Sequence, residues 1–145
     1  MEEKPMTYVT ALRRYGLRFC LRYLLETHFF DIRYGIETKE RIYPSDFKEK
    51  VPNIEHGKAY MPAWTSEIRK SFYYILNNVE NLNEFTFFDI GCGKGKVLIV
   101  WRLLAIKHEL DLNAYGVDYY GEVIRRAKDN YKKVFGVEGN FIEAD

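Results

Sequence analysis

The second half of the chain alternates between short apolar segments and segments in which apolar residues recur with helical spacing. The strand-like segments are 85–90, 114–118 and 141–145, and the helix-like segments are 96–108 and 121–135. Strands that alternate with helices through short links lie parallel and are joined by right-handed crossovers. The sequence therefore predicts an α/β fold with a parallel sheet, in which 85–90 is a buried strand.

The region before this alternation has a different pattern. From about residue 10 to 30, apolar side chains recur at steps of three and four, which predicts an amphipathic helix that docks on something larger. Glycines and prolines punctuate 31–62, which we interpret as a long connection with little regular structure. A further helix is expected to run to about residue 79, with Thr65 or Ser66 as its cap.

Composition and charge narrow the function classes. The net charge is +1, which gives no overall attraction to nucleic acid or to an anionic membrane. The longest apolar run, Val97 to Trp101, is too short to span a bilayer, so we expect neither a membrane nor nucleic acid as a partner. Cys20 and Cys92 lack the neighbours of a zinc site or a disulfide framework, so no metal is expected. A reducing cytoplasm is the simplest setting.

The segment most informative about chemistry is Asp89-Ile-Gly91-Cys-Gly93-Lys-Gly95-Lys96, between the first strand and its helix. Glycines there permit a tight turn and let a ligand lie against bare backbone, beside the free amides of the helix start. A phosphate-binding P-loop needs a glycine where Lys96 stands, so that class is excluded. A dinucleotide fingerprint also needs a glycine at that position, which weakens the case for an oxidoreductase.

The segment resembles the Asp/Glu-x-Gly-x-Gly-x-Gly motif of class I S-adenosylmethionine-dependent methyltransferases, and the match is complete. The resemblance implies a Rossmann-like fold, here incomplete, with strands 1–3 of the parallel sheet and an N-terminal helical extension. On this basis we divide a single structural unit into 1–64, the helix and long loop, and 65–145, the cofactor-binding half-domain. The cofactor implied is S-adenosylmethionine. The motif and strand-end residues expected at the cofactor are Asp89, Gly91, Cys92, Gly93, Gly95, Asp118, Tyr119 and Asp145.

Two further acidic residues end the next two strands. The resemblance places Asp118 at the ribose hydroxyls, since a carboxylate can accept from both, and Asp145 near the adenine amino group. Other roles stay open: Asp89 can satisfy the turn, Asp118 can cap the following helix, and Asp145, the last residue, can be frayed. Cys92 is expected to be a small side chain in the turn.

The resemblance extends upstream to Phe30-Asp-Ile-Arg-Tyr-Gly-Ile-Glu-Thr38 and Tyr60-Met-Pro-Ala-Trp64. These stretches are similar to a group of small bacterial and archaeal class I methyltransferases, and loosely to non-SET histone lysine methyltransferases, whose long loop closes over the cofactor. The likeness implies that Tyr60 and Thr65 lie beside the methionine end of the cofactor. For Tyr60, the alternative is aromatic packing under a loop.

The function predicted is the cofactor-binding portion of a methyltransferase, acting on an unidentified protein or small molecule. The alternative is a non-catalytic S-adenosylmethionine-binding module or a subunit of a complex. No catalytic residue is predicted, because the family's nucleophile-holding residues follow a fourth strand. Without that strand one edge of 85–90 is bare, which predicts self-association or completion by a partner chain. Lys94 and Lys96 are expected to face solvent.

Overall fold

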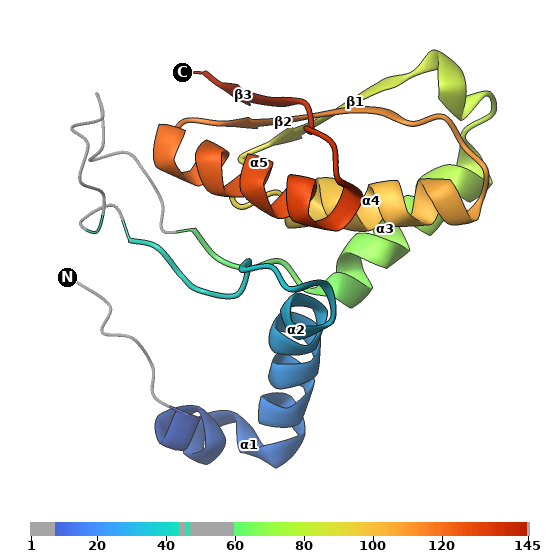
Figure 1. Cartoon of the computed structure of the whole chain (residues 1–145). Helices are drawn as coiled ribbons and strands as arrows, with labels where there is room; N and C mark the ends of the chain where they lie inside the picture. Colours follow the sequence, from blue (N-terminus) through green and yellow to red (C-terminus); the bar gives the residue numbers. More distant parts are fainter. Residues whose placement is uncertain (1–7, 44–45, 47–59, 145) are drawn as a thin grey trace.

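The computed structural model describes residues 8–43, 46 and 60–144. A sheet of three parallel strands in the order β1-β2-β3 forms one layer of the molecule (Figure 1). The strands are β1 (Thr86–Ile90), β2 (Asn113–Asp118) and β3 (Phe141–Glu143). The predicted α/β fold is confirmed: three parallel strands are connected through helices, and a helical extension precedes them at the N-terminus.

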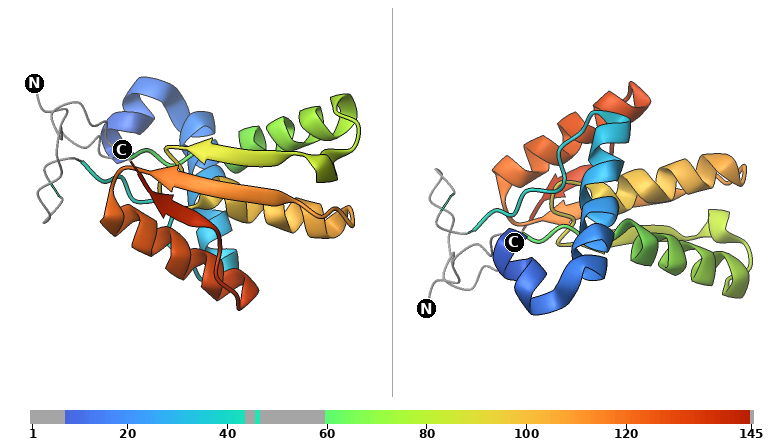
Figure 2. Two further views of the ribbon diagram at one scale, coloured as in Figure 1. Left: turned by 90° about the horizontal axis from the view of Figure 1, so that it is seen from above. Right: turned by 90° about the horizontal axis from the view of Figure 1, so that it is seen from below.

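Helices cover one face of this sheet (Figure 2). They are α3 (Thr65–Asn78), α4 (Lys96–Lys107) and α5 (Gly121–Phe135), and a short 3₁₀ turn, η4 (Leu82–Glu84), precedes β1. Trp101 of α4 packs edge-on against Phe87 of β1, and Tyr131 of α5 packs against Phe141 of β3. Aromatic pairs at these spacings bury large areas and fix the helices on the sheet.

The main hydrophobic core includes residues from both halves of the sequence. Phe30 and Ile36 are buried in the same cluster as Ile68 and Phe72 of α3 and Ile99 of α4. Burial of apolar area is the main favourable contribution to folding. The segment around residues 30–36 is therefore held against the α/β layer by the same contacts that hold the layer together.

The prediction that β1 is a buried strand is wrong for one of its faces. Phe88 is 58% exposed and Ile90 85% exposed, and Phe88 stacks on Tyr115 of β2 on the same face. Side chains alternate between the two faces of a strand, and α3, α4 and α5 all lie on the other face. Within the described residues nothing covers the face that carries Phe88 and Ile90.

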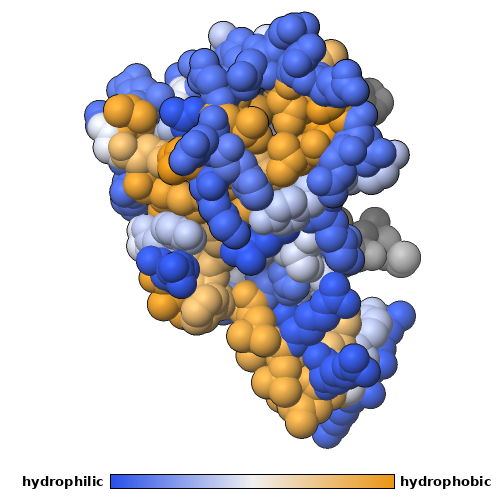
Figure 3. All heavy atoms as spheres, turned by 90° about the vertical axis from the view of Figure 1, so that its right-hand side faces the viewer, coloured by the Kyte–Doolittle hydropathy of each residue, from blue (hydrophilic) through white to orange (hydrophobic). Residues whose placement is uncertain are grey.

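The N-terminal helix is longer and less regular than predicted. It consists of α1 (Tyr8–Leu24), a π-helical turn η1 (Leu25–Phe29) and α2 (Phe30–Tyr34), with a kink at Gly16 (φ 79°, ψ 169°). The expected docking of its apolar face is wrong for the leucines, because Leu17, Leu21 and Leu25 are exposed. The N-terminal helix forms the lower part of the molecule in Figure 3, where hydrophobic residues are visible on the surface. No helix in the described part of the chain is long and apolar enough to cross a membrane.

The start of α3 does not use the predicted cap. Trp64 occupies the cap position without a side-chain hydrogen bond. Instead, Glu26 of the π-helical turn accepts the Ser66 amide N–H on its carboxylate at 2.8 Å, and its backbone carbonyl accepts the Thr65 hydroxyl at 3.0 Å. A carboxylate beside free first-turn amides is favourable. The cap is thus supplied by a residue 40 positions upstream, which no local pattern indicates.

Candidate cofactor site

The glycine loop (residues 91–95) connects β1 to α4 with a backbone that needs glycine. Gly91, Gly93 and Gly95 have φ values of 78°, 53° and 80°, in the left-handed region that side chains disfavour. α4 begins directly afterwards at Lys96, so its first-turn amides lie at the end of the loop. The motif glycines therefore have the backbone role that the sequence predicted.

Four of the five loop amides donate to acceptors other than Asp89. Gly91 and Cys92 both donate to the Val117 carbonyl of β2, at 2.8 and 3.0 Å, and Gly95 donates to the Cys92 carbonyl at 3.0 Å. The amide of Gly93 donates to an Asp118 carboxylate oxygen at 2.8 Å. The alternative role for Asp89, as the group that satisfies the turn, is therefore taken by other acceptors.

Asp89 itself is a partly buried carboxylate with an unused oxygen. Its Oδ2 is inaccessible to solvent and has no hydrogen-bond partner. Burial, together with the nearby Asp118 carboxylate, raises the pKa of Asp89 to about 6. Buried polar atoms in folded proteins almost always have partners, so this oxygen is the position at which a cationic or hydrogen-bonding ligand group would be stabilised.

Asp118 lies at the end of β2 and contacts both the loop and the next helix. One carboxylate oxygen accepts from Gly93, and the other accepts the Tyr120 amide N–H at 3.1 Å. Tyr120 occupies the cap position of α5, which has no side-chain cap of its own. An ionised carboxylate has about four acceptor positions, so Asp118 retains capacity for a diol while it holds the loop.

Tyr60 lies on the glycine loop. A β-carbon added to Gly93 would overlap the Tyr60 ring. The Tyr60 hydroxyl donates to the Thr38 carbonyl at 2.7 Å, and the Tyr60 backbone N–H donates to the Ile42 carbonyl at 2.8 Å. Burial raises the pKa of the phenol well above its usual range. Tyr60 is thus an aromatic cover, held by an upstream segment, over the backbone expected to meet a ligand.

Cys92 and Gly95 contribute packing at the base of the loop. The Cys92 side chain is buried, and burial raises the pKa of its thiol, so it is a weak nucleophile. A β-carbon on Gly95 would press against the Phe141 ring of β3 and against Ala127 of α5. Gly91, by contrast, has open space where a side chain would stand, and there the loop offers bare backbone.

The remaining predicted residues are less directly placed. The Tyr119 ring packs edge-on against Tyr120 at 5.1 Å, beside Asp118. The Thr65 hydroxyl is bonded to the Glu26 carbonyl. Asp145 lies outside the described residues. Within those residues, no group of three or more His, Cys, Asp or Glu side chains is arranged to hold a metal ion.

Glu143 is an acidic residue at this edge that the sequence reasoning missed. It pairs with Asp118 in the β2–β3 register, and its carboxylate lies against Gly121 at the start of α5. Glu143 is the last residue of β3. A carboxylate at the end of a parallel strand is the signal that could have identified it.

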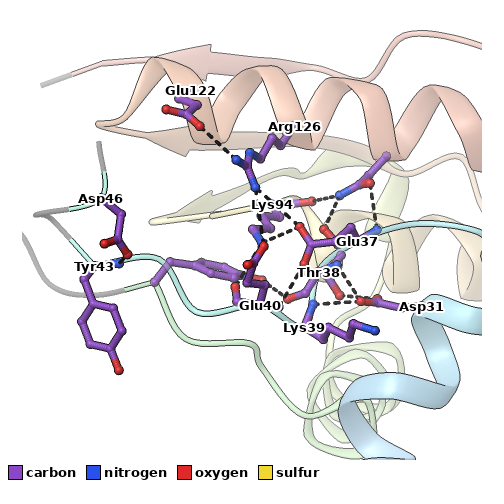
Figure 4. A network of polar contacts seen from close by, with 12 residues as sticks. Asp31, Glu37, Thr38, Lys39, Glu40, Tyr43, Asp46, Lys94, Glu122 and Arg126 are labelled. Atoms are coloured by element: carbon purple, nitrogen blue, oxygen red, sulfur yellow. Dashed lines mark hydrogen bonds and ion pairs between the residues drawn. The ribbon is translucent and has the colours of Figure 1, made fainter. Parts of the chain in front are cut away.

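The prediction that Lys94 and Lys96 face solvent is wrong. Lys94 is 0% exposed and Lys96 2% exposed. The Lys94 ammonium contacts Glu37 at 2.5 Å (Figure 4), and the Lys96 Nζ donates to the Glu26 carbonyl at 2.8 Å. Burial lowers the pKa of Lys96 to about 8. Their partners come from far upstream, so nothing near the motif indicates that these side chains turn inward.

Comparisons with known proteins give structural likeness only. No protein-family model matches the chain, and no curated protein does. The chain is similar to the plantazolicin methyltransferase BpumL in complex with SAH, with 25% identity over 56% of this chain and 27% of that one, at a TM-score of 0.35.

It is also similar to magnesium protoporphyrin IX methyltransferase (ChlM) from Synechocystis PCC 6803. The structure with bound SAH is 17% identical over 89% of this chain and 52% of that one, with a TM-score of 0.44. The structure with bound SAM is 17% identical over 88% and 54%, with a TM-score of 0.45. The chain thus spans between 27% and 54% of the length of these structures.

Proposed function

We propose that this chain is the cofactor-binding portion of an S-adenosylmethionine-dependent methyltransferase, with an unidentified protein or small molecule as the acceptor. The observation that carries the proposal is the buried, unpartnered Oδ2 of Asp89, two residues before Gly91, whose backbone has open space where a side chain would stand. A cationic ligand suits this position, because it compensates a carboxylate that burial otherwise disfavours. S-adenosylmethionine carries both a sulfonium and an ammonium group.

The strand ends supply the other contacts in this proposal. Asp118 accepts from the two ribose hydroxyls with its remaining lone pairs, and Tyr119 lies beside it. Asp145 is assigned to the adenine amino group, as the motif resemblance implies. Tyr60 and Thr65 are assigned to the methionine end, where the Tyr60 ring already lies on Gly93.

The residues of the chain would bind and orient the cofactor rather than react with it. When bound, S-adenosylmethionine supplies a methyl group that its sulfonium activates for in-line displacement. The glycine loop and Asp118 fix the position of the cofactor, which lowers the entropic part of the barrier. The Tyr60 ring excludes water from the loop. The nucleophile and any proton acceptor remain unassigned among the described residues.

Calorimetric titration separates this proposal from a nucleotide-dependent oxidoreductase. S-adenosylhomocysteine, the demethylated cofactor, is expected to bind and NADH is not. Tight binding of NADH without a response to S-adenosylhomocysteine would reverse the proposal.

A variant of Asp118 tests the site itself. Asp118→Ala is expected to weaken S-adenosylhomocysteine binding by about 1–3 kcal/mol, the usual cost of losing a charge-assisted hydrogen-bond partner. Asp129→Ala, at an exposed acidic residue of α5, is the matched control and should bind as the wild type does. An unchanged dissociation constant for Asp118→Ala would show that this carboxylate does not face the ribose.

A further inference from the structure

A fully buried ammonium group lies within the glycine loop. Lys94 has no solvent exposure, and its Nζ contacts the Glu37 carboxylate at 2.5 Å and the Glu40 carbonyl at 3.0 Å. The Glu40 carboxylate lies 3.8 Å away, and the centre of the Tyr60 ring 5.4 Å away. A charge is stable in such a position only when it is paired and hydrogen-bonded. Each of these partners comes from upstream of α3.

Residues 36–42, which we name the strap, are therefore attached to the loop by Lys94. A second cation strengthens the attachment: Arg126 of α5 lies 3.7 Å from Glu37 and 3.9 Å from Glu40, and it pairs with Glu122 at 2.9 Å (Figure 4). Two carboxylates of the strap thus share two cations, of which Lys94 is the buried one.

Asn130 of α5 joins the strap and the loop directly. Its amide nitrogen donates to the backbone carbonyls of Glu37 and Lys94, at 3.0 and 3.2 Å, and its oxygen accepts the Glu37 N–H at 3.2 Å. A buried side chain with three backbone partners specifies one arrangement of those backbones. Glu37 is therefore held twice: its carboxylate pairs with Lys94, and its backbone is hydrogen-bonded to the Asn130 side chain.

The strap in turn holds Tyr60. Asp31 accepts the Thr38 amide, the Thr38 hydroxyl and the Lys39 amide at 2.6–2.8 Å, which fixes the strap backbone at Thr38. The carbonyl of Thr38 accepts the Tyr60 hydroxyl at 2.7 Å. The Tyr60 ring then returns to Gly93. The contacts therefore lead from Lys94 through the strap and Tyr60 back to Gly93, the preceding residue of the same loop.

We infer that Lys94 is a positioning residue, which sets the place of Tyr60 over the cofactor through its charge pair with Glu37. The inference rests on the proposed function for its effect on cofactor affinity. Lys94 does not touch the cofactor in this inference. Its loss would loosen the strap at Glu37 and Glu40, because their carboxylates would then have only the partly exposed Arg126 as a cationic partner.

The first experiment replaces the cation with an apolar side chain of similar length. In Lys94→Met, amides of the strap are expected to exchange hydrogen faster than in the wild type, without any ligand. The dissociation constant for S-adenosylhomocysteine is expected to rise about tenfold or more, since removing the buried cation leaves Glu37 with only the more distant Arg126 as a cationic partner. Lys132→Met, at an exposed lysine of α5 that lies 3.7 Å from Glu138, is the matched control and should change neither readout.

A second variant separates positioning from general destabilisation. Adding Glu37→Gln to Lys94→Met removes the uncompensated carboxylate and keeps an acceptor, so part of the lost affinity should return. A lysine that only stabilised the fold would lower the melting temperature and leave the affinity of the folded fraction unchanged, which would overturn the inference. Unchanged strap exchange in Lys94→Met would also overturn it.

Two further outcomes are informative. If Lys94→Met does not fold, Glu37→Gln alone tests the inference, because this side chain is 39% exposed. Faster hydrogen exchange of the strap and weaker binding of S-adenosylhomocysteine are then expected. Wild-type values for both would overturn the inference. If the wild type does not bind S-adenosylhomocysteine, the proposed function fails. Strap exchange in the ligand-free variants still decides whether Lys94 positions the strap.

Discussion

The aromatic ring of Tyr60 lies against the backbone of Gly93, where no side chain could stand beside it. The loop expected to receive a ligand is therefore covered by Tyr60, which precedes α3 in the chain. A ligand at this loop has to pack beside the ring or shift it. Under the proposed function, we expect the affinity for S-adenosylmethionine to depend on the placement of Tyr60 for this reason.

Gly93→Ala should weaken the binding of S-adenosylhomocysteine, and Gly93→Val should abolish it. The helices should remain formed in both variants. A β-carbon at Gly93 displaces the Tyr60 ring and strains a backbone with φ 53°. Titration calorimetry and far-ultraviolet circular dichroism measure the two effects. Gly136→Ala is the control, because Gly136 also has a positive φ, at 73°, but has open space around it. Wild-type affinity in Gly93→Val would mean that the ligand does not use this loop.

Binding of S-adenosylhomocysteine should weaken as the pH falls below 6. The raised pKa of Asp89, about 6 in the free protein, means that the group is increasingly protonated below that pH. A cationic ligand favours the ionised form, so binding must release the proton, and the dissociation constant rises by up to about tenfold per pH unit. Titrations between pH 5 and 7 test this. Asp89→Asn should show a flat profile, and a flat profile in the wild type would place the ligand ammonium elsewhere.

The stability of the fold should rise with pH above 8 because of Lys96. Its pKa is lowered to about 8 in the folded chain, against an ordinary value of 10.5. Between these values the unfolded chain holds a proton that the folded chain has lost, so the free energy of unfolding increases with pH. Below pH 8 both states are charged and the penalty is constant.

Urea unfolding of the wild type and of Lys96→Met measures this effect. The difference between their free energies of unfolding should shift in favour of the wild type by about 1–2 kcal/mol between pH 7.5 and 9.5. A constant difference across that range would show that the buried site does not disfavour the ammonium group.

The exposed face of the sheet should cause the chain to self-associate. Phe88 and Ile90 are large apolar side chains on a strand whose outer edge has no partner among the described residues, and such edges pair with other chains. Phe88→Lys should lower the weight-average mass in sedimentation velocity experiments. Ile106→Lys, at an exposed isoleucine of α4, is the control. A wild type that sediments as a monomer at high concentration would contradict the prediction.

Local pattern predicted the second half of the fold closely. The helix at 121–135 has the predicted bounds, and β1 begins at Thr86, one residue later than expected. These elements follow from periodicity and from the turn residues between them. The glycine loop was predictable for the same reason, since left-handed backbone has few substitutes for glycine.

What the sequence could not show depends on partners far away in the chain. The contacts of Lys94 with Glu37 and Glu40 join residues 57 and 54 positions apart. The burial of a lysine is decided by such partners and not by its neighbours. In the same way, an apolar run such as 85–90 does not reveal whether one face or both will be covered.

The π-helical turn at Leu25–Phe29 sets the rotation of α1 about its axis relative to α2. A π turn accommodates one more residue than the corresponding α turn, and one residue of an α-helix corresponds to about 100° of rotation about its axis. Shortening the turn by one residue would therefore swing the leucines of α1 by roughly a quarter of a revolution. The side on which Leu17 and Leu21 emerge is set by the count of residues in this turn.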